Sequence, residues 1–106
     1  MRIDNIHQAL KQFHVQNPSS KEILLPATAS QLSQTSGYTR TAVSEELSEL
    51  VRKDQVVKVK SRPVLFFDKD YLEEQFPFFK SSTCYDSLAS LQEDIYQQTE
   101  QIHKKK

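Results

Sequence analysis

The stretch Ser36–Phe67, SGYTRTAVSEELSELVRKDQVVKVKSRPVLFF, contains the features that decide the fold. It contains Gly37, the only glycine of the chain, and continues with apolar residues at helical spacing. Two short apolar runs then flank Ser61–Pro63. A tight turn, a helix and a hairpin are therefore expected to follow one another directly.

The helix in this stretch is expected from about Arg40 to Lys53, with the hydroxyl of Thr39 as its N-cap. At 3.6 residues per turn, four apolar residues share one face of this helix within an arc of about 100°: Val43, Leu47, Leu50 and Val51. Glycine adopts a left-handed backbone conformation without steric hindrance, so Gly37 suits a steep turn before this helix.

The residues before this stretch predict two more helices and a short strand. Apolar residues three and four positions apart indicate an amphipathic helix over about residues 3–15, namely Ile3, Ile6, Leu10 and Phe13. The apolar run Ile23–Pro26 is a candidate strand. Thr28 is a candidate N-cap of a short helix over Ala29–Ser36, which Gly37 closes.

The residues after the helix predict a hairpin and another short helix. Gln55–Lys60 alternates apolar and basic residues, and Val64–Asp68 is rich in residues that favour strands. Because two or three residues join these runs, a hairpin is expected. The next helix begins with Asp68 or Asp70 as its cap and ends at Pro77.

This order of elements predicts an α+β, mainly α fold. The expected architecture is a winged helix-turn-helix with a three-helix core, a β-hairpin wing and a C-terminal helical extension. Residues 1–76 are expected to form the winged domain and residues 77–83 a linker. Residues 84–106 are expected to form a helix of about 20 residues, which packs on the domain, dimerises or begins a following module.

In a helix-turn-helix the second helix lies in the major groove, so the exposed face of the helix after Gly37 is the candidate reading face. The residues expected to contact double-stranded DNA from this helix and its cap are Thr39, Arg40, Thr41, Ser44, Ser48 and Arg52. Lys58, Lys60 and Arg62 lie near the hairpin tip and are expected to meet phosphates or a minor groove.

Three acids on the same helix, Glu45, Glu46 and Glu49, would repel a duplex if they faced it. Helical geometry places Glu46 and Glu49 on the flank and Glu45 close to the reading face. There Glu45 either accepts a hydrogen bond from a cytosine amino group or weakens binding. The acids and the zero net charge support an alternative function, a protein-interaction winged helix that does not bind DNA.

The segment Thr39–Glu73 resembles the N-terminal winged-helix domain of the sugar-phosphotransferase-controlled, sigma-54-dependent transcriptional activators of the levanase-operon-regulator type. In that family a glycine and a Ser/Thr-Arg pair open the recognition helix, and a Gly-Arg-Pro-Val turn follows a strand with alternating lysines. The matching residues, within about residues 25–75, are Gly37, Thr39, Arg40, Val43, Ser44, Leu47, Leu50, Lys58, Lys60, Arg62, Pro63 and Val64. The resemblance implies sequence-specific DNA binding by a bacterial transcription regulator.

The chain also departs from the family pattern. Ser61 stands where the family usually has glycine, and Ser36 stands where leucine is usual. The sequence contains neither a glycine-rich ATPase phosphate loop nor phosphotransferase regulation domains. It is therefore expected to be the isolated DNA-binding domain of a longer regulator or a stand-alone relative.

Composition argues against several other classes of protein. Fourteen Lys and Arg residues balance fourteen Asp and Glu residues, so the chain is no polycation. The N-terminus lacks the uninterrupted apolar segment of a signal peptide, and no run reaches the roughly 20 apolar residues of a membrane span. A soluble, cytoplasmic protein without a membrane partner is expected.

No catalytic or cofactor site is predicted. Cys84, the only cysteine, cannot form an intramolecular disulfide and is expected to be a half-buried apolar residue. His7 and His14 lie seven positions apart without a third metal ligand, so surface or partly buried positions are expected. With no nucleophile elbow and one glycine, the chain is expected not to be an enzyme and to hold no cofactor, metal or small-molecule ligand.

Two groups of apolar residues have alternative roles. The first surrounds Pro77 and either packs in the core or forms a docking patch; it consists of Phe76, Phe78 and Phe79. The second is a stripe on the last helix, interrupted by Gln98 and made of Leu88, Leu91, Ile95 and Ile102. This stripe either packs on the domain or forms the seam of a homodimer.

Overall fold

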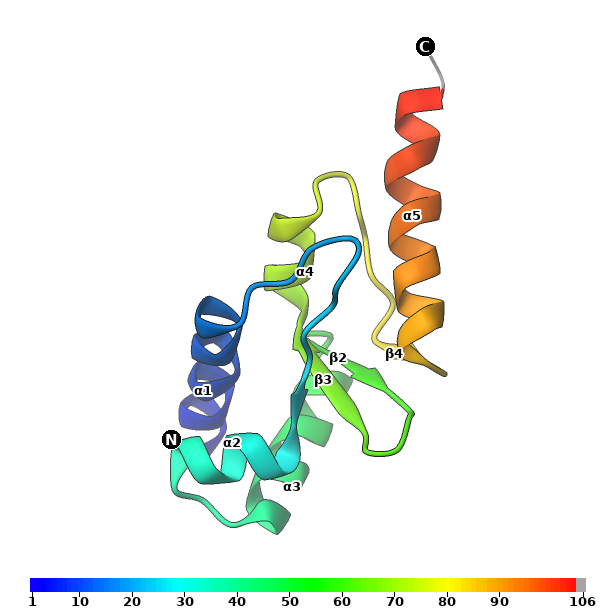
Figure 1. Cartoon of the computed structure of the whole chain (residues 1–106). Coiled ribbons are helices and arrows are strands. Elements are labelled where there is room, and N and C mark those ends of the chain that lie inside the picture. Colours follow the sequence, from blue (N-terminus) through cyan, green and yellow to red (C-terminus); the bar gives the residue numbers. More distant parts are fainter. Residues whose placement is uncertain (105–106) are drawn as a thin grey trace.

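Five helices and one four-stranded sheet make up the part of the chain that the computed structural model describes, residues 1–104, with side chains described through residue 100. The fold is α+β and mainly helical, as predicted. In chain order the elements are α1 (Arg2–Gln16), β1 (Ala27–Thr28), α2 (Ala29–Ser36), α3 (Arg40–Arg52), β2 (Val56–Val59), β3 (Leu65–Asp68), α4 (Lys69–Gln75), β4 (Cys84–Tyr85) and α5 (Leu88–Lys104) (Figure 1). Within the described residues, no helix has the length and apolarity needed to cross a membrane.

The sheet is built around the β2–β3 hairpin, and its strand order is β1-β3-β2-β4. Strand β3 pairs antiparallel with both β1 and β2, whereas β4 pairs parallel with β2. In the hairpin register Val57 lies opposite Phe67 and Lys58 opposite Phe66. Because side chains alternate along a strand, these two pairs point to opposite faces of the sheet.

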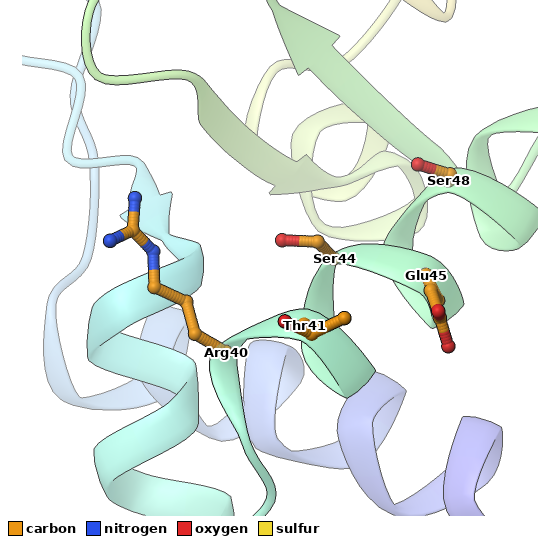
Figure 2. Close-up of a pocket in the computed structure, with 5 residues that line it drawn as sticks. All are labelled: Arg40, Thr41, Ser44, Glu45 and Ser48. Atoms are coloured by element: carbon orange, nitrogen blue, oxygen red, sulfur yellow. The ribbon is translucent and has the colours of Figure 1, made fainter.

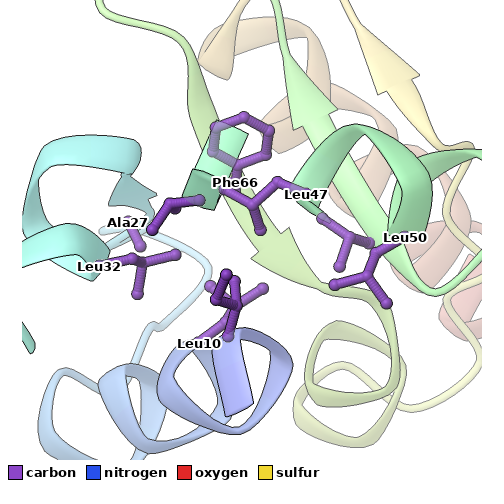
Figure 3. Close-up of a cluster of buried hydrophobic side chains, with 9 residues drawn as sticks. Leu10, Ala27, Leu32, Leu47, Leu50 and Phe66 are labelled. Atoms are coloured by element: carbon purple, nitrogen blue, oxygen red, sulfur yellow. The ribbon is translucent and has the colours of Figure 1, made fainter. Parts of the chain in front are cut away.

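One face of the hairpin packs on α1, α2 and α3 and forms the first hydrophobic core (Figure 3). Its buried residues are Ile6, Leu10, Ala27, Leu32, Val43, Leu47, Leu50, Val56 and Phe66. The predicted apolar stripes of α1 and α3 thus meet each other and the sheet. This core fixes α3 against the hairpin.

The other face of the hairpin packs on α4 and α5 and forms a second hydrophobic core. Its buried residues are Leu24, Val57, Val59, Phe67, Leu72, Phe76, Phe79, Leu91 and Ile95. Figure 1 accordingly shows α5 and α1 on opposite sides of the hairpin. The helical extension predicted from the sequence therefore packs on the chain's own sheet.

The ends of the central helices confirm the predicted caps. Thr28 and Gln31 form a reciprocal capping box at the start of α2, and Gly37 ends that helix with a left-handed φ of 81°. The Thr39 hydroxyl accepts a hydrogen bond from the Ala42 N–H at 3.2 Å. The turn between α2 and α3 is thus defined by local hydrogen bonds and by glycine's conformational freedom.

Three predicted boundaries are wrong. The strand expected at Ile23–Pro26 does not form there, and the two-residue β1 follows it at Ala27–Thr28, where the backbone pairs with β3. Leu24 packs in the second core, whereas Ile23 is 61 % exposed. The hairpin connection spans residues 60–64, longer than the two or three residues expected. The last helix begins at Leu88 because Cys84–Tyr85 pairs with β2, and residues 105–106 of the expected helix lie outside the described part of the chain.

The segment expected as a linker, residues 77–83, is hydrogen-bonded to α5 and β2. Gln98 accepts from the Lys80 N–H at 2.8 Å and donates to the Lys80 carbonyl at 2.9 Å. The Thr83 carbonyl accepts from the Lys58 N–H at 2.8 Å. These bonds explain the polar residue in the apolar stripe of α5, because Gln98 satisfies the backbone of this segment.

The stripe on α5 faces the second core, where Leu91 and Ile95 are fully buried and Leu88 is half-buried. Of the two alternatives, packing on the domain and pairing with a second copy, these three side chains do the first. The side chain of Ile102 lies outside the described residues. Self-association through α5 stays a prediction.

The structure separates the three phenylalanines around Pro77, and it places Cys84 and His14 differently from the expectation. Phe78 is 73 % exposed at a left-handed φ of 73°, whereas its neighbours Phe76 and Phe79 are buried. Cys84 is exposed on an edge strand instead of half-buried. His14 is buried, contrary to the expected surface or partly buried position, because it stacks between the rings of Phe67 and Tyr71.

Asp68 joins α1 to the start of α4. Its carboxylate accepts hydrogen bonds from His7 Nε2 at 2.7 Å, Lys11 Nζ at 2.9 Å and the Tyr71 N–H at 3.2 Å. Burial alone would raise the pKa of Asp68, but the hydrogen bonds from His7 and Lys11 outweigh burial and lower it. Of the two candidate caps of this helix, Asp68 is therefore the one used.

His14 completes this junction. Its Nε2 accepts a hydrogen bond from the Asp68 N–H at 3.0 Å, so the neutral ring carries its proton on Nδ1. That Nδ1 is buried without a hydrogen-bond partner among the described residues. Burial lowers the pKa of His14 from 6.5 to about 4.

Acidification is expected to destabilise the fold between pH 6.5 and 4. The unfolded chain protonates His14 near pH 6.5 but the folded chain only near pH 4, so unfolding takes up a proton in this range. The expected loss is about 2–4 kcal/mol of unfolding free energy, measured by urea denaturation at a series of pH values. His14→Gln, which can still accept from Asp68, should be less stable at pH 7 and less sensitive to pH. An equally steep loss in this variant would contradict the assignment.

Candidate nucleic-acid interface

The exposed face of α3 forms a shallow hollow of about 450 Å³. The residues that line it are Arg40, Thr41, Ser44, Glu45 and Ser48 (Figure 2). Three of these five carry short hydroxyl side chains, so the helix backbone can approach a flat or grooved partner closely. Figure 2 shows Arg40 and Glu45 on opposite sides of this face, with Thr41 between them.

A second groove, of about 460 Å³, runs between α3, the start of α2 and the hairpin. It is lined by Thr28, Ala29, Ser30, Arg40, Ser44, Ser48, Lys58, Pro63, Val64 and Phe66. The cations Arg40 and Lys58 come from a helix and a strand that the first core holds together. Hydroxyl and apolar side chains line the same groove, among them Ser44, Ser48 and Val64. We call this groove the α3–hairpin groove.

The structure brings together five of the nine predicted site residues around these two hollows. They are Arg40, Thr41, Ser44, Ser48 and Lys58. Thr39 is engaged as the N-cap of α3, and Arg52 forms an ion pair with Glu49 outside both hollows. Lys60 and Arg62 are exposed in the hairpin connection but do not line the α3–hairpin groove.

Strand β4 holds the hairpin from its outer edge. The Lys60 N–H donates to the Tyr85 carbonyl at 2.8 Å, next to the bond from Lys58 to residue 83. The Tyr85 hydroxyl donates to Asp94 Oδ2 at 2.5 Å and accepts from the Ser82 N–H at 3.0 Å. Burial and the bond to Asp94 raise the pKa of Tyr85 to about 12. Helix α5 is thereby connected to the strand that carries Lys58.

Arg2, which the sequence analysis did not single out, compensates acids of α3. Its Nε donates to Glu46 Oε2 at 2.6 Å, and its Nη2 lies 3.4 Å from Glu45 Oε1. Glu46 and Glu49 lie on the flank, as predicted, and do not line the α3 hollow. No sequence signal linked Arg2 to Glu45 and Glu46, because these three residues meet only when α1 packs on α3.

Two further hollows have different lining residues. One of about 270 Å³ is almost wholly apolar, beside the exposed Phe78 and between α4 and α5. Another, of about 210 Å³, lies beside Lys11, Asp68 and Tyr71. Within residues 1–104, no group of three or more His, Cys, Asp and Glu side chains is arranged to hold a metal ion.

Comparison of the chain with family models, curated proteins and solved structures finds no match. The resemblance to the sigma-54-dependent activators therefore stays a prediction.

Tyr85→Phe is expected to loosen the hold of α5 on the hairpin, because it removes the hydroxyl that contacts Asp94. If the free energy of local opening falls by about 1.4 kcal/mol, the hydrogen-exchange rates of the Lys58 and Lys60 amides should rise roughly ten-fold. Amides in the middle of α1 serve as the internal control and should keep their rates. Unchanged exchange at both lysines would show that the hydroxyl does not support β4.

Proposed function

We propose that the chain is a winged helix-turn-helix domain that binds double-stranded DNA sequence-specifically in a bacterial transcription regulator. In this proposal α3 lies in the major groove and the β2–β3 hairpin is the wing. The observation that carries it is the α3–hairpin groove, where Arg40 and Lys58 line one concave surface with Ser44 and Ser48. Cations and hydroxyls are the side chains that most often contact phosphates and base edges.

The order of elements supports this proposal. Helix α2, the left-handed Gly37 and helix α3 form a short helix–turn–helix unit, followed directly by the hairpin. The buried stripe of α3 contains Val43, Leu47 and Leu50, so the opposite face is free to enter a groove. That face carries Arg40 near its N-terminal end, where recognition helices make base contacts.

The distribution of charge is also compatible with DNA, although the net charge is zero. Arg2 pairs closely with Glu46 and lies 3.4 Å from Glu45, and Arg52 pairs with Glu49, so each of the three acids of α3 has a cationic neighbour within the chain. Arg40 and Lys58 remain on the wall of the α3–hairpin groove. Lys60 and Arg62, in the hairpin connection, extend this positive surface toward a neighbouring phosphate or minor groove.

A second candidate function is protein docking without DNA binding. The observation that favours it is Phe78, an exposed aromatic residue at a left-handed φ beside the apolar hollow between α4 and α5. Exposed aromatic side chains next to apolar hollows often contact partners. The DNA proposal is preferred because the α3–hairpin groove unites cations and hydroxyls that the family resemblance implies for base and phosphate contact.

Fluorescence anisotropy tests the proposed function with two duplexes, one of random sequence and one from the region upstream of the protein's own operon. Tighter binding to the operon duplex is expected, with log affinity falling linearly with log salt concentration. Arg40→Ala should weaken binding to the preferred duplex by about 1–3 kcal/mol and hardly change binding to the random one.

Lys80→Ala is the control, since it removes one positive charge from an exposed side chain that lines neither hollow and leaves the acids of α3 paired. It should reduce binding much less than Arg40→Ala. Absence of binding to either duplex at low salt would overturn the DNA proposal and favour protein docking. Equal loss on both duplexes for Arg40→Ala would make Arg40 a phosphate contact.

A further inference from the structure

Glu45 is the acid that lines the α3 hollow. Its side chain is 63 % exposed, one helical turn after Thr41, on the side of the face opposite Arg40 (Figure 2). A carboxylate brought close to a duplex is repelled by phosphates unless it accepts a hydrogen bond there. On a bound duplex, Glu45 would therefore either weaken binding or accept a hydrogen bond from a donor of the DNA.

The hydrogen bonds of the neighbouring acids distinguish Glu45 from them. Glu46 receives the short bond from Arg2 Nε at 2.6 Å, and Glu49 pairs with Arg52. Glu45 has only one contact, 3.4 Å from Arg2 Nη2 to its Oε1. Its Oε2 accepts no hydrogen bond from the described residues, so this oxygen is free to accept from a partner.

We propose that Glu45 selects a cytosine in the DNA site by accepting a hydrogen bond from the cytosine N4 amino group in the major groove. The proposal rests on the proposed DNA-binding function and extends it to one base position. Arg2 is the positioning residue: its Nε is held by Glu46, which directs its Nη2 toward Glu45 Oε1. The same guanidinium reduces the negative charge that Glu45 and Glu46 present to the phosphates.

Major-groove chemistry explains the choice of cytosine. Guanine presents two acceptors there and thymine one acceptor with a methyl group, so both repel or fail to satisfy a carboxylate. Adenine has an amino donor, but its N7 acceptor lies beside that donor. Cytosine presents an amino donor and no acceptor on its own major-groove edge, so it can donate to the free Oε2 of Glu45.

The surroundings of Glu45 allow the short reach that this contact needs. Thr41, Ser44 and Ser48 on the same face have small side chains, so α3 can lie deep in the groove. Arg2 is held in place because Ile6 and Leu10 anchor α1 in the first core. The Asn5 side chain adds a hydrogen bond to the Tyr38 hydroxyl at 2.9 Å, in the turn before α3.

The test is selection of bound duplexes from a randomised library by the whole chain, followed by anisotropy on single-base variants of the selected site. The wild-type chain should prefer cytosine about ten-fold or more at one position. Glu45→Gln should lose that preference or shift it to adenine, which a glutamine contacts bidentately, while the other positions stay unchanged. Arg2→Met should weaken the cytosine preference at the same position, and its melting temperature reports whether the fold is retained.

Glu93→Gln on the exposed surface of α5 is the matched control and should leave the selected site unchanged. If Glu45→Gln keeps the preference and binds every duplex more tightly by one factor, Glu45 is only repulsive and the proposal is overturned. The proposal also fails if the wild-type chain selects a site in which no position depends on Glu45, although DNA binding then stands. If the wild-type chain selects no sequence and binds no duplex, the proposed function itself fails and this inference fails with it.

Discussion

The hairpin β2–β3 is buried on both faces, and the rest of the structure depends on this constraint. Val56 and Phe66 face α1, α2 and α3, whereas Val57 and Phe67 face α4 and α5. Burying each of these side chains contributes roughly 1.5–3 kcal/mol. A one-residue shift of register would turn Lys58 from the α3 side into the second core, and burying an unpaired charge there is costly, so the hairpin has one stable placement between the two cores.

This placement determines what remains available for a partner. Lys58 has the same parity as Val56, so it points to the α3 side of the sheet and lines the α3–hairpin groove. The two edges of the hairpin are covered by β1 and β4, which leaves the connection over residues 60–64 as its projecting part. A helix face and a hairpin held rigidly side by side can contact two parts of one duplex, which is the basis of the proposed function.

Local sequence predicted the features that depend on near neighbours. Thr28, Gly37 and Thr39 act over three or four positions, so their roles as caps and turn follow from residue type alone. The exposed position of Ser44 and Ser48 follows from the helical period of the buried residues between them. About half of the candidate site could be predicted in this way, because most of it lies on one helix.

The features that the sequence did not predict depend on contacts between distant segments. Strand β4 is two residues long and forms only because β2 offers a free edge. Gln98 interrupts the apolar stripe of α5, and its partner Lys80 is 18 positions away. His14 extends the apolar stripe of α1, and its partner Asp68 is 54 positions away. Arg2 reaches Glu45 and Glu46 over 43 and 44 positions, so its place beside the exposed face of α3 depends on the packing of α1 on α3.

The proposed function requires the duplex to bind on α3 and the hairpin. The most direct measurement is an NMR titration of the isotopically labelled chain with a duplex, following every backbone amide. We expect the largest shift changes over residues 40–48 and 56–64, with little change around residues 76–80. Changes confined to the region of Phe78 and α5, or no change at any duplex concentration, would contradict DNA binding by this surface.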